Sequence, residues 1–379
     1  MRTRDNFPKY PNTPRITISM KTSSFRYPEI VDILLSHAPC VLATVIQTHG
    51  STPQKAGSLA ITSANQLLAG TVGGGITELK VIKKAQIALE AKVSEIFSID
   101  LSGDITKGSE SICGGGMTVL LDTSPELHLP VFLQLDRSLK ERQKGVLMTL
   151  VEETYHEKIK ISRHWFSTSS QPPLPVELRN KIEPVINEML EKLDGGSCRL
   201  IPLKELEIRS DGFIFLERIL PKPSLIIAGA GHIGQSLVQL GKFLDFKVTV
   251  WDDRPEFANQ TLIPDADSVL SGSIDSVVDK LHIRDDSYLV IVTRGHKNDA
   301  EVLRKFISLD LAYIGIIGSK AKASQMRMTF LDNGWATPDQ WDRIFTPIGL
   351  DIGAQSVEEI ALSIAAQLVK VRNLKYTPQ

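Results

Sequence analysis

The sequence predicts an α/β fold with an N-terminal α/β domain and a C-terminal domain built around a parallel sheet. The apolar run Ser224–Ala228 leads straight into a glycine-rich turn and then an amphipathic segment, which indicates a strand, a turn and a helix. Later runs at Tyr288–Thr293 and Tyr313–Ile317 are near-continuously apolar, as parallel strands buried on both faces are. In the first half, short runs rich in β-branched residues alternate with glycine turns and one long helical pattern.

The chain length and the breaks in patterning predict the domain organisation. The 379 residues suffice for two or three domains, each with a substantial core. We expect a flexible leader at residues 1–22, the N-terminal α/β domain at 23–123, and a middle region at 124–221 that packs on the N-terminal domain. Prolines at Pro221 and Pro223 disfavour a continuing helix or strand, so the C-terminal domain is expected at 222–379.

Composition excludes several classes of function. Lys plus Arg number 43 and Asp plus Glu 44, and the net charge of −1 gives no footprint for nucleic acid or an anionic membrane. The sequence has no run of about 18 uncharged apolar residues and no signal-peptide core, which predicts a cytoplasmic protein. Its three cysteines are too few and too scattered for a disulfide framework or a zinc cluster.

Local patterning predicts the individual elements. In the first 123 residues we expect a helix at Ile30–Leu35, strands at Cys40–Thr48, Ser58–Thr62 and Met117–Leu121, and a helix at Ile76–Lys92. The apolar face of that last helix is expected to consist of Ile76, Leu79, Ile82, Ala85 and Leu89. In the middle region the candidates are strands at Val131–Leu133, Gly145–Val151 and Arg199–Leu203, and a helix at Pro184–Leu193. In the C-terminal domain we expect helices at Asp299–Ser308, Lys322–Leu331 and Val357–Val371.

The turn Gly229-Ala230-Gly231-His232-Ile233-Gly234 has the G-x-G-x-x-G pattern of a Rossmann-type dinucleotide-binding unit. Gly229 permits the tight turn, Gly231 lets the backbone approach a pyrophosphate, and Gly234 lets the helix pack close. Asp252 follows Gly229 by 23 residues, near the roughly 20 expected of a carboxylate that binds a ribose. Glycines that serve only the turn are the alternative, so the pattern predicts the fold and leaves the ligand open.

Polar residues follow the predicted strands of this domain, at the edge where such sheets bind ligands. Basic and hydroxyl groups gathered there favour a phosphorylated ligand. Because loops in general are also polar, the alternative for each single residue is a purely structural role. The residues expected to bind at this edge, besides the glycines and Asp252, are Arg254, Arg294, His296, Ser319 and Lys320.

The N-terminal domain contains a second candidate site. Gly73-Gly74-Gly75 opens a predicted helix and so offers backbone N–H groups to an anion, with Ser51 as a further donor. Cys113 precedes three glycines, and neighbouring amide dipoles favour the thiolate, the form that binds metals and carries sulfur. A simply buried thiol is the alternative.

These motifs resemble the xanthine dehydrogenase accessory family of the XdhC/CoxI type, and the resemblance spans most of the chain. In the N-terminal domain the motifs are Gly50–Pro53 with Gly57, Gly70–Gly75 with Glu78, and Cys113–Gly115. In the C-terminal domain they are Gly229–Gly234, Asp252–Phe257, Thr293–His296 with Asp299, Gly315–Lys320 and Pro347–Ala354. The middle region matches the family poorly.

The resemblance implies a chaperone for molybdenum hydroxylases more than an enzyme. Such a factor binds the molybdenum cofactor, molybdopterin, protects it while a cysteine desulfurase installs its sulfido ligand, and inserts it into a client of the xanthine dehydrogenase type. Cys113 would contact molybdenum or sulfur, and Gly73–Gly75 and Glu78 would shape that site, while the Rossmann edge holds phosphate or nucleotide. Relatives of the CO dehydrogenase type often have a cysteine where this chain has Ile76, which favours the xanthine dehydrogenase branch. The oligomeric state is open, and a homodimer is one alternative.

Two other functions are compatible with the residues. In an NAD(P)-dependent oxidoreductase, Asp252 would bind the ribose, Arg254 a 2′-phosphate, and His296 would act as acid or base. The sequence has no evident substrate-domain motif for hydride transfer. A hydrolytic metal site built on His49, His232 and His296 is the weaker alternative, because their spacing matches no metal-ligand pattern.

Overall fold

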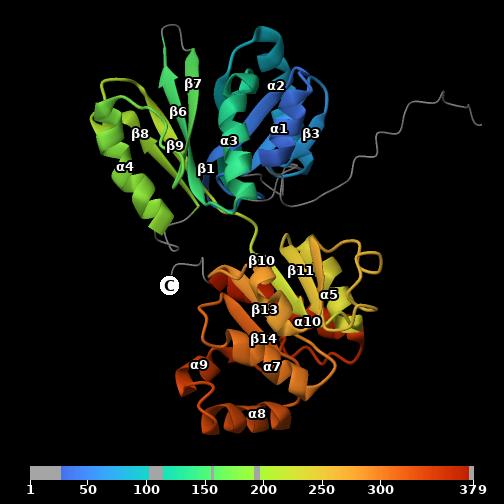
Figure 1. The fold of residues 1–379 in the computed structure, drawn as a ribbon. Coiled ribbons are helices and arrows are strands. Elements are labelled where there is room, and N and C mark those ends of the chain that lie inside the picture. The colour runs from blue at the N-terminus through green and yellow to red at the C-terminus, as the bar shows by residue number, and fades with distance from the viewer. Residues whose placement is uncertain (1–26, 102–113, 155–157, 192–196, 375–379) are drawn as a thin grey trace, which may run out of the picture. The chain divides into compact units, whose positions relative to one another are not determined.

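The computed structural model describes residues 27–101, 114–154, 158–191 and 197–374 (Figure 1). The predicted leader at 1–22 lies outside these residues. Contacts divide the chain into two compact units, Met1–Glu126 and Leu127–Gln379. The middle region therefore belongs to the same unit as the C-terminal domain, and its packing on the N-terminal domain stays a prediction.

The first unit is built on an antiparallel sheet. Its five strands lie in the order β3-β2-β1-β5-β4, and all four pairings are antiparallel. Three of the strands were predicted, whereas β3 and β4 were missed because their short runs are only partly buried. The elements are α1 (Tyr27–Leu35), β1 (Val41–His49), β2 (Leu59–Thr62), β3 (Leu67–Gly70), α2 (Gly75–Ala91), β4 (Glu95–Asp100) and β5 (Gly116–Asp122).

Helix α2 exists where the sequence predicts it, and the predicted apolar face is partly confirmed. Ala85 is buried, and Leu89 is partly buried against the core. Leu79, by contrast, is 66% exposed. The buried residues that the prediction missed are Thr77, Val81 and Ala88. Most of the buried residues are small, so the helix lies close to the sheet.

The second unit begins with an antiparallel sheet in the order β7-β6-β9-β8. The predicted strand at Val131–Leu133 is wrong, because these residues lie in a helix that begins with a proline in its first turn and buries Phe132 and Leu135. The predicted helix at Pro184 begins earlier, at Val176, and continues through the proline. The elements are α3 (Leu129–Lys140), β6 (Gly145–Glu153), β7 (Ile159–Ser167), α4 (Val176–Glu191), β8 (Cys198–Pro202) and β9 (Gly212–Ile219).

The remainder of the second unit is the predicted parallel sheet. Its strand order is β12-β11-β10-β13-β14-β15, and every pairing is parallel. Numbered from β10, this is the order 3-2-1-4-5-6 of the Rossmann fold. The strands are β10 (Ser224–Ala228), β11 (Lys247–Asp252), β12 (Ser268–Ser271), β13 (Ser287–Ile291), β14 (Tyr313–Ile316) and β15 (Ile344–Phe345). The prediction of a Rossmann-type C-terminal domain is confirmed.

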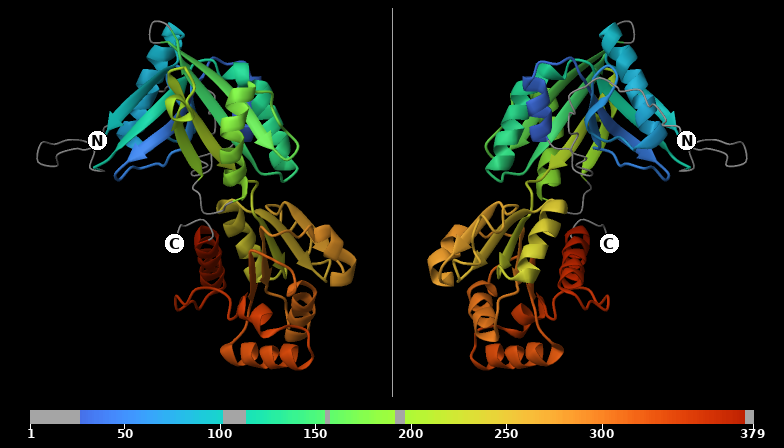
Figure 2. Two further views of the ribbon diagram at one scale, coloured as in Figure 1. Left: turned by 90° about the vertical axis from the view of Figure 1, so that its left-hand side faces the viewer. Right: turned by 90° about the vertical axis from the view of Figure 1, so that its right-hand side faces the viewer.

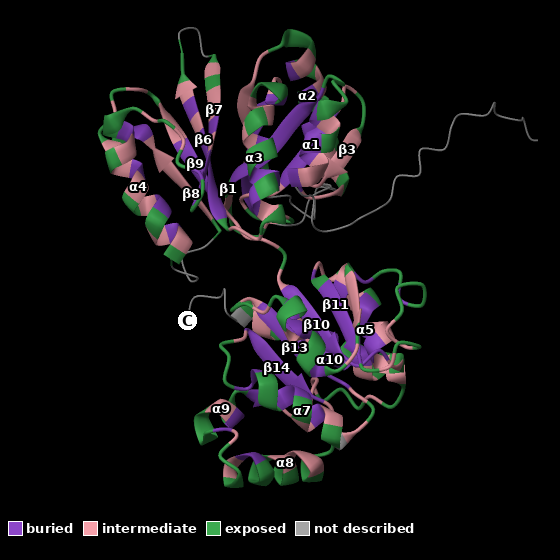
Figure 3. Ribbon diagram, viewed as in Figure 1, coloured by how far each residue is buried: buried purple, intermediate pink, exposed green. Residues whose placement is uncertain are grey.

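Helices cover both faces of this sheet (Figures 1 and 2). One apolar core joins the sheet to α5 and α10, and the other joins it to α6, α7 and α8. Strands β10 and β13 are consequently buried along their whole length (Figure 3). The helices are α5 (His232–Phe243), α6 (Ile274–Val277), α7 (His296–Phe306), α8 (Lys320–Asp332), α9 (Pro338–Asp342) and α10 (Val357–Leu374). Of the helices in the described ranges, none is both long enough and apolar enough to span a membrane.

Candidate functional site

Two glycine-rich segments of the first unit pack on one loop. The loop His49–Pro53 leaves the end of β1. A Cβ atom added at Gly115 would lie 2.4 Å from the carbonyl oxygens of both His49 and Ser51. A Cβ atom at Gly73 would lie 2.8 Å from the Pro53 ring. Such close approach requires glycine, so Gly115, which follows Cys113, and Gly73, which precedes α2, are both packed against this loop.

The start of α2 is an open cradle of backbone, formed by Gly74 and Gly75. Both residues have positive φ, 68° and 51°, which disfavours any side chain. A Cβ atom on either would have nothing within 4 Å. The helix has no side-chain cap. Its first N–H groups are therefore available to an anion.

Glu78 supports this cradle from the first turn of α2. The Thr71 hydroxyl donates to Glu78 Oε1 at 2.5 Å, and the same hydroxyl oxygen accepts from the N–H of Gly73 at 3.2 Å. Glu78 thus fixes the turn that precedes the helix. The sequence associated Glu78 with this site, and the structure brings it together with Gly73.

The structure describes two of the three cysteines, Cys40 and Cys198. Cys113 lies outside the described residues, although its neighbour Gly114 is packed against Gly50. Burial raises the pKa of Cys40 to about 11, and the carboxylates of Glu126 and Asp122 add to this effect. Burial and the charge of Glu217 raise the pKa of Cys198 to about 12. Neither thiol is prepared to act as a thiolate near neutral pH.

The Rossmann turn follows β10 directly. The φ of Gly229 is 124°, and a Cβ atom there would lie 2.3 Å from the carbonyl oxygen of Val292. A Cβ atom at Gly234 would lie 1.9 Å from the carbonyl oxygen of Gly229. Gly231, by contrast, has nothing within 4 Å of an added Cβ atom. These are the separate roles that the pattern predicts for the first, third and second glycines.

Asp252, at the end of β11, is bonded on both of its oxygens. Its carboxylate accepts from the N–H of Ala230 at 2.8 Å and from the N–H of Arg254 at 3.1 Å. It also forms a bidentate pair with the Arg254 guanidinium, at 2.9 and 3.0 Å. Burial alone would raise the pKa of Asp252, but these hydrogen bonds outweigh it and lower that pKa. We call this arrangement of Asp252, Arg254 and Ala230 the aspartate clasp, because it joins β11 to the glycine turn.

In a buried cluster next to the turn, Asp299 and Thr293 were named from the sequence, but Lys322 was missed. Asp299, which is fully buried, accepts from the Thr293 hydroxyl at 2.5 Å and from Lys322 Nζ at 2.8 Å. The ammonium group of Lys322 also donates to the carbonyl of Ile317 at 3.2 Å. The cluster thus ties together the segments that follow β13 and β14.

The sequence had instead selected the neighbours of Lys322. Ser319 caps α8 by accepting from the N–H of Lys322 at 3.2 Å, and Lys320 is exposed. Arg294 has 60% of its side chain exposed. The side chain of His296 lies outside the described part of the structure. Lys322 was identifiable as a residue in the first turn of a helix that opens at the sheet's ligand edge.

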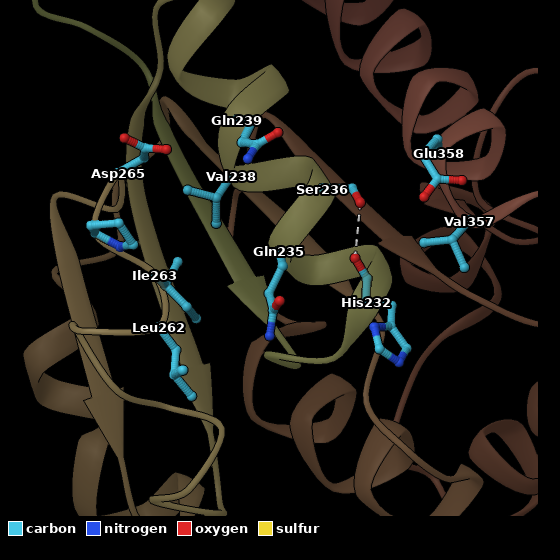
Figure 4. Close-up of a pocket in the computed structure, with 11 residues that line it drawn as sticks. His232, Gln235, Ser236, Val238, Gln239, Leu262, Ile263, Asp265, Val357 and Glu358 are labelled. Carbon is cyan, nitrogen blue, oxygen red and sulfur yellow. Dashed lines mark hydrogen bonds between the residues drawn. The ribbon is translucent and has the colours of Figure 1, made fainter.

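A pocket of about 560 Å³ lies along α5, beginning at His232 beside the glycine turn (Figure 4). Its other walls are the segment Leu262–Asp265 and the first turn of α10. The described side chains that line it include carboxamides and the carboxylates of Asp265 and Glu358, with no lysine or arginine. Within the described residues, no group of three His, Cys, Asp or Glu side chains is arranged to hold a metal ion.

Both halves of the chain match family models. The model of the XdhC and CoxI family matches residues 33–100, and the model of the XdhC Rossmann domain matches residues 225–368. The chain belongs to the XdhC and CoxI family. The suspected family is thus confirmed, and the two matched ranges contain the glycines before α2 and the Rossmann turn.

Relatives of this XdhC-type chain extend over nearly all of it. A protein of Bacillus subtilis (strain 168), described as a probable subunit of xanthine dehydrogenase, is 25% identical over 352 residues, which are 90% of this chain and 96% of that protein. The uncharacterized protein YqeB of Escherichia coli (strain K12) is 22% identical over 338 residues, 89% of this chain but 44% of that protein. A crystal structure described as a xanthine dehydrogenase from Bacillus halodurans has a TM-score of 0.71 and 25% identity, covering 92% of this chain and 96% of that one.

Proposed function

We propose that the protein is a maturation factor that carries the molybdenum cofactor as cargo and delivers it to a molybdenum hydroxylase of the xanthine dehydrogenase type. Membership of the XdhC and CoxI family supports this, as do two similar proteins whose descriptions name xanthine dehydrogenase. The observation that carries the proposal is the open cradle of Gly74 and Gly75, whose neighbour Gly73 packs on the same His49–Pro53 loop as Gly115, a glycine that follows Cys113.

The cradle fits the anionic part of this cargo. Molybdopterin ends in a phosphate, and N–H groups at the start of a helix bind phosphate without any cationic side chain. A side chain on Gly74 or Gly75 would fill the open space beside these N–H groups. Ser51, which is exposed in the His49–Pro53 loop, is a further donor.

In this proposal Cys113 contacts the molybdenum or the sulfido ligand of the cargo. A thiolate suits molybdenum or its sulfido ligand better than oxygen donors do. Gly114, its described neighbour in sequence, is packed against Gly50 in the His49–Pro53 loop. The raised pKa values of Cys40 and Cys198 leave these two as poor alternatives. A cysteine desulfurase would supply sulfur to the cargo while it is held.

The Rossmann-type sheet supports a nucleotide-binding role for the C-terminal domain. In a maturation factor, the edge of the sheet at the carboxyl ends of its strands would hold the phosphate or the nucleotide end of a ligand, or NAD(P) itself. An NAD(P)-dependent oxidoreductase is the second candidate function, and the strand order and glycine turn favour it. It explains nothing about the N-terminal cradle.

Transfer of the cargo tests the proposal. The full chain is loaded anaerobically with sulfurated cofactor and mixed with purified cofactor-free xanthine dehydrogenase, and the hydroxylase activity is followed. We expect faster activation than free cofactor gives, and a rate lowered about tenfold in Cys113→Ala, with Cys198→Ala as the matched control.

Two outcomes would contradict this account. Activation no faster than with free cofactor, together with saturable NAD(P)H binding and hydride transfer, would replace the maturation factor by the oxidoreductase. Full activity of Cys113→Ala would remove that thiol from the transfer step.

A further inference from the structure

The aspartate clasp leaves Asp252 without a free acceptor for a ribose. Its side chain is 3% exposed, and its two oxygens already accept four hydrogen bonds. Arg254 is equally engaged, since its guanidinium pairs with Asp252 and stacks 3.8 Å from the centre of the Phe257 ring. Asp252, at the position that ordinarily binds the ribose in this fold, therefore holds the glycine turn here.

Asp253 is the carboxylate that remains available. Its side chain is 37% exposed, and it follows the last residue of β11. In the described residues its polar contacts are long: 3.4 Å to Asn298 Nδ2, 3.8 Å to Arg294 Nη2 and 3.9 Å to Arg254 Nε. At these distances a ligand hydroxyl competes readily for the Asp253 oxygens.

The contact between Asp253 and Arg294 spans the binding edge of the sheet. Asp253 follows β11 and Arg294 follows β13, and these two strands flank β10 on either side. The glycine turn begins at the end of β10. The two side chains therefore approach each other across the crevice where strand order reverses, which is the ligand position in such sheets.

We propose that Asp253, and not Asp252, accepts the ribose hydroxyls of a ribonucleotide whose phosphate lies between the glycine turn and Arg294. This inference rests on the nucleotide-binding part of the proposed function and specifies its ligand. The ligand class is a nucleotide with free 2′- and 3′-hydroxyls. A 2′-phosphate is disfavoured, because Asp253 would repel it, the Arg254 guanidinium is held by Asp252, and Arg294 is assigned to the other phosphate of the ligand.

Calorimetric titration of the full chain with ADP, 2′,3′-dideoxy-ADP, NAD⁺ and NADP⁺ tests this assignment. We expect ADP to bind about tenfold more tightly than its dideoxy form, and NADP⁺ to bind no more tightly than NAD⁺. In Asp253→Ala the preference for ADP over dideoxy-ADP falls to about one. Asp252→Asn keeps that preference even where the affinity of both ligands drops. Asp285→Asn, a change of the same charge before β13 at the opposite edge, is the matched control.

Three results would overturn the assignment: no binding of ADP, equal binding of ADP and dideoxy-ADP by the unaltered chain, or a preference that survives in Asp253→Ala. Cofactor transfer is measured separately and without added nucleotide. A chain that discriminates between the two forms of ADP but transfers no cofactor retains the Asp253 assignment and loses the maturation function. A chain that transfers cofactor but binds both forms of ADP equally loses the Asp253 assignment and retains the maturation function.

Discussion

The two glycine-rich sites of this chain look alike in sequence but are supported differently. At the start of α2, Gly73 packs on the Pro53 ring, a Thr71–Glu78 hydrogen bond holds the turn, and the cradle residues Gly74 and Gly75 face open space. At the Rossmann turn, a buried charged pair, Asp252 with Arg254, fastens the glycine turn to the neighbouring strand. A buried ion pair thus braces the second turn, whereas the first is braced by a hydroxyl–carboxylate hydrogen bond and by the packing of Gly73 on Pro53.

The largest expected loss of stability comes from replacing a closely packed glycine in the Rossmann turn. Gly234→Ala places a methyl group 1.9 Å from a backbone oxygen that cannot move away easily, so we expect a loss of about 3 kcal/mol in the free energy of unfolding. Gly231→Ala, with open space and ordinary φ, should cost below about 1 kcal/mol. Urea unfolding of both variants measures the difference. Equal losses would mean that the turn is not held by close packing.

The next largest loss of stability is expected when the aspartate clasp is broken. Asp252→Asn removes a charged partner from a mostly buried guanidinium, and we expect a loss of about 2 kcal/mol at pH 7. The pKa of Asp252 is lowered in the folded chain, so this stabilisation is present above the unfolded pKa of about 3.9 and declines as the pH falls below it.

The difference in unfolding free energy between the unaltered chain and Asp252→Asn, measured from pH 7 down to pH 3, checks this sign. Other carboxylates are common to both chains and cancel from the difference. A difference that grows on acidification would show that the carboxylate is not held as the anion.

A smaller effect is expected at the N-terminal cradle. Thr71→Val removes the bond to Glu78 and the acceptor for the N–H of Gly73, which should cost about 1 kcal/mol. Thr118→Val breaks an exposed hydroxyl contact with Ser98 in the same sheet and should cost less than about 0.5 kcal/mol. Thermal unfolding of the two variants compares them. A Thr71 variant no less stable than the Thr118 variant would assign Glu78 no role in fixing the turn.

Long patterns with one dominant period were predictable from the sequence. The parallel sheet followed from buried runs such as Leu225–Ala228, where burial on both faces leaves no other arrangement. The face of α2 was only partly predictable, because part of its contact with the sheet is made by residues such as Thr77 and Ala88, which a hydrophobicity pattern underweights. Strands β7 and β9 were missed in the middle region, although the turn dipeptide Asp211-Gly212 stands at the start of β9.

The candidate sites were predictable as segments but not as contacts. Glycine patterns located both turns, because backbone geometry there requires glycine. The pairing of Asp252 with Arg254, and the burial of Lys322 against Asp299, depend on side-chain directions that only the folded chain defines. The sequence therefore predicted Asp252 as the ligand-binding carboxylate, whereas the oxygens of its neighbour Asp253 have the longer and more easily displaced contacts.

Retention of pterin by the purified chain tests the central claim, that the N-terminal cradle holds the molybdenum cofactor. The chain is loaded anaerobically and desalted, and pterin fluorescence is measured after oxidative release, for the unaltered protein, Gly75→Ala and Gly334→Ala. Both glycines have positive φ, 51° and 65°, and open surroundings, so the two substitutions carry a similar backbone cost. We predict that the unaltered chain and Gly334→Ala retain pterin, and that Gly75→Ala loses it about tenfold. No retention by the unaltered chain, or equal retention by all three, would contradict the account.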